Sequence, residues 1–279
     1  MNWDNMHDDY SFSPPEPRDE KKYDGVAEAD TETLVVKIAP KSSLEKLHAE
    51  VSAIPCSLLF FAPLFSFRKV AHTDTHVLAR RVVLTPFFSR FEQLAPVLLV
   101  PHMLWSFRRL LQSLHLLGQH GMYCASYDNI GFKNHVPYIR DFSYVNEQRD
   151  HRSLETEFLC FLRDQPKEYV VTRDDIMRVC RSFLAGRGAV TISEPLDVCG
   201  KLLQKVQRWP RDKAVAWLEG FGEKACVFSL SSLYVHLIEE LSIYDVPEPF
   251  LALLTEGISY APASRPTMVE AMRAIHMIM

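Results

Sequence analysis

The pattern of apolar and polar positions changes along the chain, from short strand-like runs in its first part to helical stripes in the remainder. Residues 1–22 are polar, acidic and proline-containing, so we expect a flexible tail that joins no core. Short runs of β-branched and apolar residues follow, as is typical of strands. These runs cover residues 34–38, 57–67 and 77–87, with a helix expected over residues 42–51.

The later part of the chain has helical periodicity. Apolar residues spaced three or four apart form one stripe that we expect Gly118 to end: Leu104, Phe107, Leu111, Leu114 and Leu117. A hairpin-like piece is expected over residues 129–144. Further helices are expected over residues 154–163, 173–184, 195–208, 212–219, 227–241, 248–256 and 267–277. A small β-rich part followed by a large helical part predicts an α+β protein.

Composition narrows the class of protein. The chain has 279 residues, of which 47% are hydrophobic and 24% charged, so it can build a substantial core. A net charge of −4 argues against a dedicated nucleic-acid binder. The most apolar run, residues 53–67, contains Pro55 and Pro63 and is too short to span a membrane. The six cysteines form no C-x-x-C pair, and no export signal is recognisable, so we expect free thiols in an intracellular protein.

Four polar residues occur in an order that suggests nucleotide chemistry. Lys37 closes the β-branched run Val35-Val36, and Glu50 lies on the helix expected next, where it would pair with that lysine. Asn129 and Asp141 are about a dozen residues apart, and amide and carboxylate oxygens suit Mg²⁺ beside a triphosphate. The structural alternative is that Lys37 and Glu50 brace a strand on its helix while Asp141 caps a turn.

Taken together, these residues resemble the signature set of serine/threonine protein kinases, and more narrowly that of the kinases of large nucleocytoplasmic DNA viruses. Four further stretches carry the resemblance. Met122–Ile130 resembles a viral catalytic loop, and Ser153–Glu155 resembles the segment that these kinases have in place of A-P-E. Val227–Tyr234 resembles the start of the central C-lobe helix, and Pro262–Thr267 resembles the terminal d-P-x-x-R-P-T element. The resemblance implies that Arg265 pairs with Glu155 and pins the activation segment to the C-lobe.

The implied fold has two lobes with a hinge near Thr85–Phe88. After the tail of residues 1–22, residues 23–86 would form an N-lobe with a small antiparallel sheet and one helix, and residues 87–279 a helical C-lobe. The stretch 163–226 is longer and less similar to the family, and is a candidate partner surface.

The departures from the family pattern predict a pseudokinase. Met122 stands where the family has the histidine of H-R-D, Cys124 replaces the catalytic aspartate, and Ser126 replaces the following lysine. Cys226 replaces the aspartate that opens the central C-lobe helix, and the glycine-rich loop is mostly missing. Losing a general base typically slows a reaction by about 10²–10⁴-fold. We therefore expect no catalytic residue at Met122, Cys124 or Ser126.

A pseudokinase can still bind ATP and partner proteins. The resemblance implies that Lys37, Glu50, Asn129 and Asp141 hold ATP, with Asn129 and Asp141 on Mg²⁺. The leading hypothesis is a scaffold or regulator in the host cytoplasm or the virion, whose partners are proteins, another kinase or capsid proteins, rather than nucleic acid or membrane. One alternative is an active divergent kinase that recruits Asp128 or Asp150 as its base. Another is a purely structural capsid or assembly protein.

Overall fold

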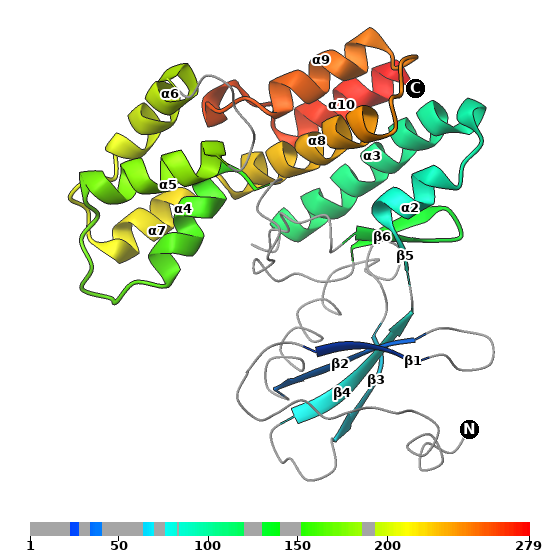
Figure 1. Cartoon of the computed structure of the whole chain (residues 1–279), viewed down its shortest axis with the longest axis horizontal. Coiled ribbons are helices and arrows are strands. Elements are labelled where there is room, and N and C mark those ends of the chain that lie inside the picture. Colours follow the sequence, from blue (N-terminus) through cyan, green and yellow to red (C-terminus); the bar gives the residue numbers. More distant parts are fainter. Residues whose placement is uncertain are drawn as a thin grey trace. The chain divides into compact units, whose positions relative to one another are not determined.

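The chain divides into two compact units, residues 1–84 and 85–279. The structure, a computed structural model, describes residues 84–119, 130–139, 152–185 and 193–279, together with the backbone of four strands within residues 23–82 (Figure 1). From the sequence we placed the division after residue 86. The expected tail, residues 1–22, and the expected helix, residues 42–51, lie outside the described residues.

The strands of the first unit form one antiparallel sheet, in the order β1-β2-β4-β3. The strands are β1 (Tyr23–Ala27), β2 (Leu34–Pro40), β3 (Leu64–Lys69) and β4 (His76–Val82). The runs expected at 34–38 and 77–87 correspond to β2 and β4. Of the expected strand at 57–67, residues 64–67 belong to β3, and residues 57–63 lie outside the described residues.

A second, three-stranded antiparallel sheet belongs to the later unit. It comprises β5 (Thr85–Pro86), β6 (Ile130–Lys133) and β7 (Val136–Ile139). Asn134 and His135 join β6 to β7 with backbone φ angles of 49° and 71°. Two successive left-handed residues match the twist of a tight hairpin, and asparagine is among the residues that tolerate this conformation best. The hairpin predicted around residues 129–144 is confirmed over residues 130–139.

Four helices of the later unit pack together, with their axes side by side in Figure 1. They are α3 (Pro96–Gln119), α8 (Gly222–Glu240), α9 (Glu248–Gly257) and α10 (Met268–Ile278), preceded by the short α2 (Phe87–Glu92). The predicted stripe from Leu104 to Leu117 is buried along α3. Gly118, expected to end this helix, instead lies within its last turn. A glycine in a terminal turn weakens a helix without breaking it.

The remaining helices form a second cluster, which we call the α4–α7 module (Figure 1). Its members are α4 (Leu154–Arg163), α5 (Arg173–Ala185), α6 (Ser193–Gln204) and α7 (Arg211–Glu219). Their apolar faces share one core, which includes Phe158, Ile176, Cys180, Leu203 and Leu218. Every helix predicted after residue 153 is present, and the described residues are mostly helical with a small antiparallel sheet, as expected of an α+β protein.

Asp175 organises the start of α5. Its Oδ2 accepts hydrogen bonds from the Tyr169 hydroxyl at 2.5 Å, the Thr172 hydroxyl at 2.6 Å and the Thr172 backbone N–H at 3.0 Å. Burial favours protonation, but these hydrogen bonds outweigh it and hold the pKa of Asp175 below its ordinary value. Burial and the bond to Asp175 raise the pKa of Tyr169 to about 12. Both groups therefore stabilise the folded protein in their neutral-pH ionisation states.

Replacing Asp175 with alanine should lower the free energy of unfolding by about 1–2 kcal/mol, because the Tyr169 hydroxyl and the Thr172 hydroxyl and N–H lose their acceptor. Since the folded pKa is depressed, the carboxylate contributes stability above its unfolded pKa, and this contribution disappears as the pH falls through the folded value. Urea denaturation of Asp175→Ala between neutral and acidic pH would measure both effects. Asp174→Ala, in the same turn but exposed, is the control and should change stability by less than about 0.5 kcal/mol. Equal effects of the two substitutions would contradict the assignment.

Candidate functional site

The structure describes only part of the site expected from the sequence. Lys37 lies near the middle of β2, where its backbone pairs with Asp24 on one side and Ala79 on the other. A position flanked by two strands is held more firmly than an edge position. The other expected nucleotide-binding residues, Glu50, Asn129 and Asp141, lie outside the described residues. The same is true of three degenerate catalytic-loop positions: Met122, Cys124 and Ser126.

The β6–β7 hairpin occupies the chain between Asn129 and Asp141. Its register pairs Ile130 with Ile139, so the strand that follows Asn129 begins beside the end of the strand that precedes Asp141. Ile130, Phe132 and Ile139 are buried, which fixes this hairpin on the helices of its unit. Asn129 is adjacent in sequence to one end of this pairing, and Asp141 follows the other end by two residues.

Glu155 and Arg265 form a buried ion pair. Arg265 Nη1 lies 3.0 Å from Glu155 Oε1 in an ionic contact, and Nη2 donates a hydrogen bond to Oε2 at 3.4 Å. The two residues are 1% and 2% exposed, and the guanidinium also lies over the Phe228 ring, 4.6 Å from its centroid. This is the pairing implied by the family resemblance. It joins the first turn of α4 to the segment before α10.

The Arg265 guanidinium is satisfied by backbone carbonyls as well as by Glu155. Its Nε donates to the Ser259 carbonyl at 2.6 Å, and Nη1 donates to the Lys224 carbonyl at 3.4 Å. Burial lowers the pKa of Arg265 from its ordinary value, and the Glu155 carboxylate opposes that change. The arginine therefore connects α4, α8 and the loop after α9 through one charged group.

Local capping explains how both partners are positioned. Ser153 is the N-cap of α4, and its hydroxyl accepts the Thr156 backbone N–H at 3.3 Å, which fixes the turn that carries Glu155. Arg265 ends the short helix η4 (Pro262–Ser264), and Thr267 then opens α10 through a capping box with Glu270. The sequence Pro262–Thr267 thus places Arg265 between the end of η4 and the N-cap of α10.

Several expectations about other residues are resolved. Cys226 is buried in the second turn of α8, and the cysteines at 160, 180, 199 and 226 are thiols rather than disulfides. Trp209 and Trp217 pack against each other within the helical unit, with ring centroids 6.1 Å apart. Across the described residues, no group of histidine, cysteine and acidic side chains has the arrangement of a metal site. None of the helices described combines the length and apolar character needed to cross a lipid bilayer.

Sequence reasoning did not anticipate the charged surroundings of the two tryptophans. Lys213 Nζ lies 4.3 Å from the centroid of the Trp209 ring, and Lys205 Nζ lies 5.7 Å from that of Trp217. The sequence signal was present, since Lys205, Arg208, Trp209 and Lys213 lie within nine residues, but the pattern alone did not indicate which faces meet.

A scan against protein-family models and a search among curated proteins each gave no match.

Proposed function

We propose that the chain is a kinase-like protein that no longer transfers phosphate and acts by binding other proteins. In this proposal residues 23–86 form the N-lobe and residues 87–279 the C-lobe of a bilobal fold. The observation that carries it is the buried pair of Glu155 and Arg265, because two sequence motifs 110 residues apart meet as the family resemblance implies. The antiparallel sheet with Lys37 on an interior strand also supports it.

Chemistry explains why activity is expected to be lost. Phosphoryl transfer needs Mg²⁺ and a lysine to neutralise charge, and an aspartate to orient the attacking hydroxyl. A cysteine at position 124 offers a thiol of ordinary pKa about 8.5, which is mostly neutral at pH 7 and a poor substitute for a carboxylate. Ser126 supplies no positive charge for the transferred phosphoryl group. The partner in this proposal is a protein, either another kinase or a capsid component, in the host cytoplasm or the virion.

Nucleotide binding is a separable part of the proposal. Lys37, held in position by Glu50, would contact the phosphates of ATP, and Asn129 and Asp141 would supply oxygens to Mg²⁺. Bound Mg²⁺ would neutralise phosphate charge. The buried hairpin between Asn129 and Asp141 supports this arrangement, since it pairs Ile130, next to Asn129, with Ile139, two residues before Asp141.

Thermal unfolding with and without ATP and Mg²⁺ tests the nucleotide site. A ligand at about 100 times its Kd adds about 2.7 kcal/mol to the free energy of unfolding. For the unit of residues 85–279, which has 195 residues, this corresponds to a rise in Tm of roughly 5–10 °C. We expect this rise to require Mg²⁺ and to disappear in Asp141→Ala.

Asp174→Ala, an exposed aspartate of α5, is the matched control and should keep the full response. No rise at millimolar ATP would contradict nucleotide binding but not the binding of proteins.

A phosphotransfer assay tests the expected loss of catalytic activity. Turnover near the roughly 1–100 s⁻¹ of kinases would overturn the proposal of a pseudokinase, and its loss in Asp128→Ala or Asp150→Ala would identify a replacement base.

A further inference from the structure

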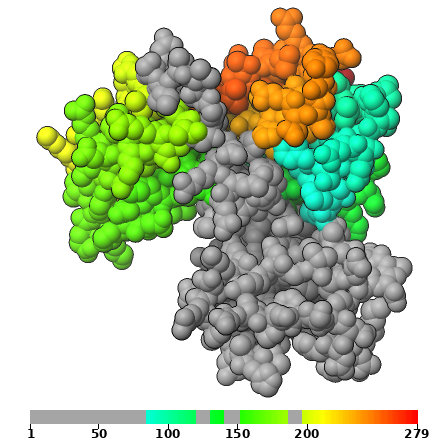
Figure 2. All heavy atoms as spheres, in the orientation of Figure 1, coloured from blue at the N-terminus to red at the C-terminus, as the bar shows by residue number. Residues whose placement is uncertain are grey.

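A row of cationic and aromatic side chains lies along α7 and the turn that joins α6 to α7. Its order is Lys213, Trp209, Trp217 and Lys205, with the two tryptophan rings in T-shaped contact between the two ammonium groups. Phe221 extends it, with its ring centroid 4.8 Å from that of Trp217. We call this set, together with Arg208, the tryptophan–lysine row. It belongs to the α4–α7 module, whose atoms appear in green to yellow in Figure 2.

The positive charge of this row is not compensated locally. The two nearby acidic residues already have partners: Asp212 contacts Arg211 at 2.8 Å, and Glu219 contacts Arg163 at 3.1 Å. In the part of the chain that the structure describes, no carboxylate lies within ion-pair distance of Lys205, Arg208 or Lys213. Lys205, Arg208 and Lys213 are all exposed. Three cations therefore remain available to an anionic partner.

The backbone holds this row in a fixed arrangement. Arg208 has a φ of 65°, in the left-handed region that a side chain larger than glycine rarely adopts. Hydrogen bonds with the segment before α5 hold it there: the Arg208 N–H donates to the Val171 carbonyl at 2.8 Å, and the Val171 N–H donates to the Trp209 carbonyl at 3.0 Å. A rigid surface loses little conformational entropy when it binds, which favours affinity.

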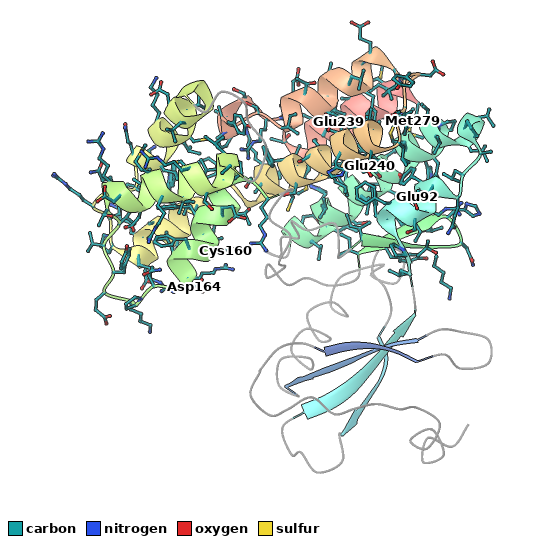
Figure 3. All side chains as sticks on the ribbon, viewed as in Figure 1. Glu92, Cys160, Asp164, Glu239, Glu240 and Met279 are labelled. Carbon is teal, nitrogen blue, oxygen red and sulfur yellow. The ribbon has the colours of Figure 1, made fainter. Side chains whose placement is uncertain are left out.

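Arg211 strengthens this arrangement from the other side. Its Nε donates to the Leu162 carbonyl at 2.8 Å and its Nη2 to the Arg163 carbonyl at 3.2 Å, so it caps the end of α4. In Figure 3 the label at Asp164 marks that end of α4, against which α7 packs. Val170, which is 49% exposed, bridges to Pro210 beside the row and adds apolar surface.

We propose that the tryptophan–lysine row binds an acidic segment of a partner protein. Aspartate or glutamate side chains of the partner would pair with Lys205, Arg208 and Lys213, and an apolar residue would pack on Val170 and the tryptophan edges. Tryptophan and arginine are the residues that most often dominate protein interfaces. This inference names the partner chemistry for the proposed binding role, and it is independent of nucleotide.

The geometry favours a protein over a nucleic acid. Single-stranded nucleic acids stack their bases on open aromatic faces, whereas here a lysine ammonium already lies over a ring of each tryptophan. Phosphate backbones are bound by extended basic surfaces, but the whole chain carries a net charge of −4. A short run of carboxylates matches the size and charge of the row better.

Fluorescence anisotropy with the full chain tests the proposal. The probe is a labelled peptide of eight glutamates around one phenylalanine, and its matched probe has glutamine at every glutamate position. We expect saturable binding of the acidic probe alone. The variant Lys205→Gln/Arg208→Gln/Lys213→Gln should bind it about thirtyfold more weakly, since three charged contacts of about threefold each multiply.

The control variant Lys133→Gln/Arg181→Gln/Arg273→Gln removes the same charge from three other elements and should leave the affinity within about twofold. The single variant Lys213→Gln, at an exposed helix position, should weaken binding about threefold. It tests the same surface if the triple variant fails to fold. Equal weakening by the control, no saturable binding of the acidic probe, or tighter row-dependent binding of a labelled oligothymidylate would each overturn the proposal.

Discussion

Arg265→Met should lower the free energy of unfolding by about 3–5 kcal/mol, because it leaves the Glu155 carboxylate buried without its counter-charge. Both side chains are almost completely buried, so water cannot replace the missing guanidinium. The substitution also removes donors from the carbonyls of Ser259 and Lys224. Urea denaturation followed by circular dichroism measures the loss.

Two further variants separate the ion pair from the volume of the side chain. Glu155→Leu/Arg265→Met should recover most of the lost stability, because replacing a whole buried pair by apolar groups is often neutral. Arg163→Met breaks an exposed pair of similar length with Glu219, whose side chains are 39% and 49% exposed, and should cost less than about 1 kcal/mol. A loss for Arg265→Met no larger than that for Arg163→Met would contradict a structural role for the buried pair.

Gly257→Ala should lower the free energy of unfolding by about 3 kcal/mol, through a steric clash between α9 and α8. A Cβ atom at position 257 would lie 2.1 Å from Ser231 Oγ and 2.7 Å from Ser231 Cβ, closer than van der Waals contact allows. Both residues are buried, so the helices must separate to make room. Overpacking of this kind typically costs about 1–3 kcal/mol, and occasionally more. Thermal and urea unfolding would both detect it.

Gly200 provides the matched control. It lies inside α6, and a Cβ atom added there meets nothing within 4 Å, so Gly200→Ala should stabilise the protein by about 0.5–1 kcal/mol. Ser231→Ala tests the contact from the other side. The buried Ser231 hydroxyl has no hydrogen-bond partner, so its loss should cost little, yet Ser231→Ala/Gly257→Ala should stay destabilised because the clash between Cβ atoms remains. Full recovery in that double variant would contradict the packing argument.

The helices were predictable because their sequence signals are local. The stripe from Leu104 to Leu117 depends only on residues within a few positions of one another, and it is buried along α3 in the structure. The first and last residues of the helices were less predictable. We expected α8 to begin at residue 227, but it begins at Gly222, because glycine is tolerated in a first turn once Glu223 and Ala225 continue the helix.

The candidate site depends on contacts between distant segments, and here sequence reasoning had unequal success. The pairing of Glu155 with Arg265 followed from a family resemblance, which carries information about distant contacts that periodicity lacks. The tryptophan–lysine row had no such guide. Lys213 covers the Trp209 ring and Lys205 the Trp217 ring, and no local pattern in the sequence indicates these contacts.

The long separation between Glu155 and Arg265 has a consequence for synthesis of the chain. The 110 residues between them leave the ribosome over roughly 5–20 s at ordinary elongation rates. During that interval Glu155 has no guanidinium to neutralise it, so α4 must remain hydrated at its first turn or be shielded by a chaperone. The buried ion pair of α4 is therefore completed only when α10, the last helix described, is about to be made.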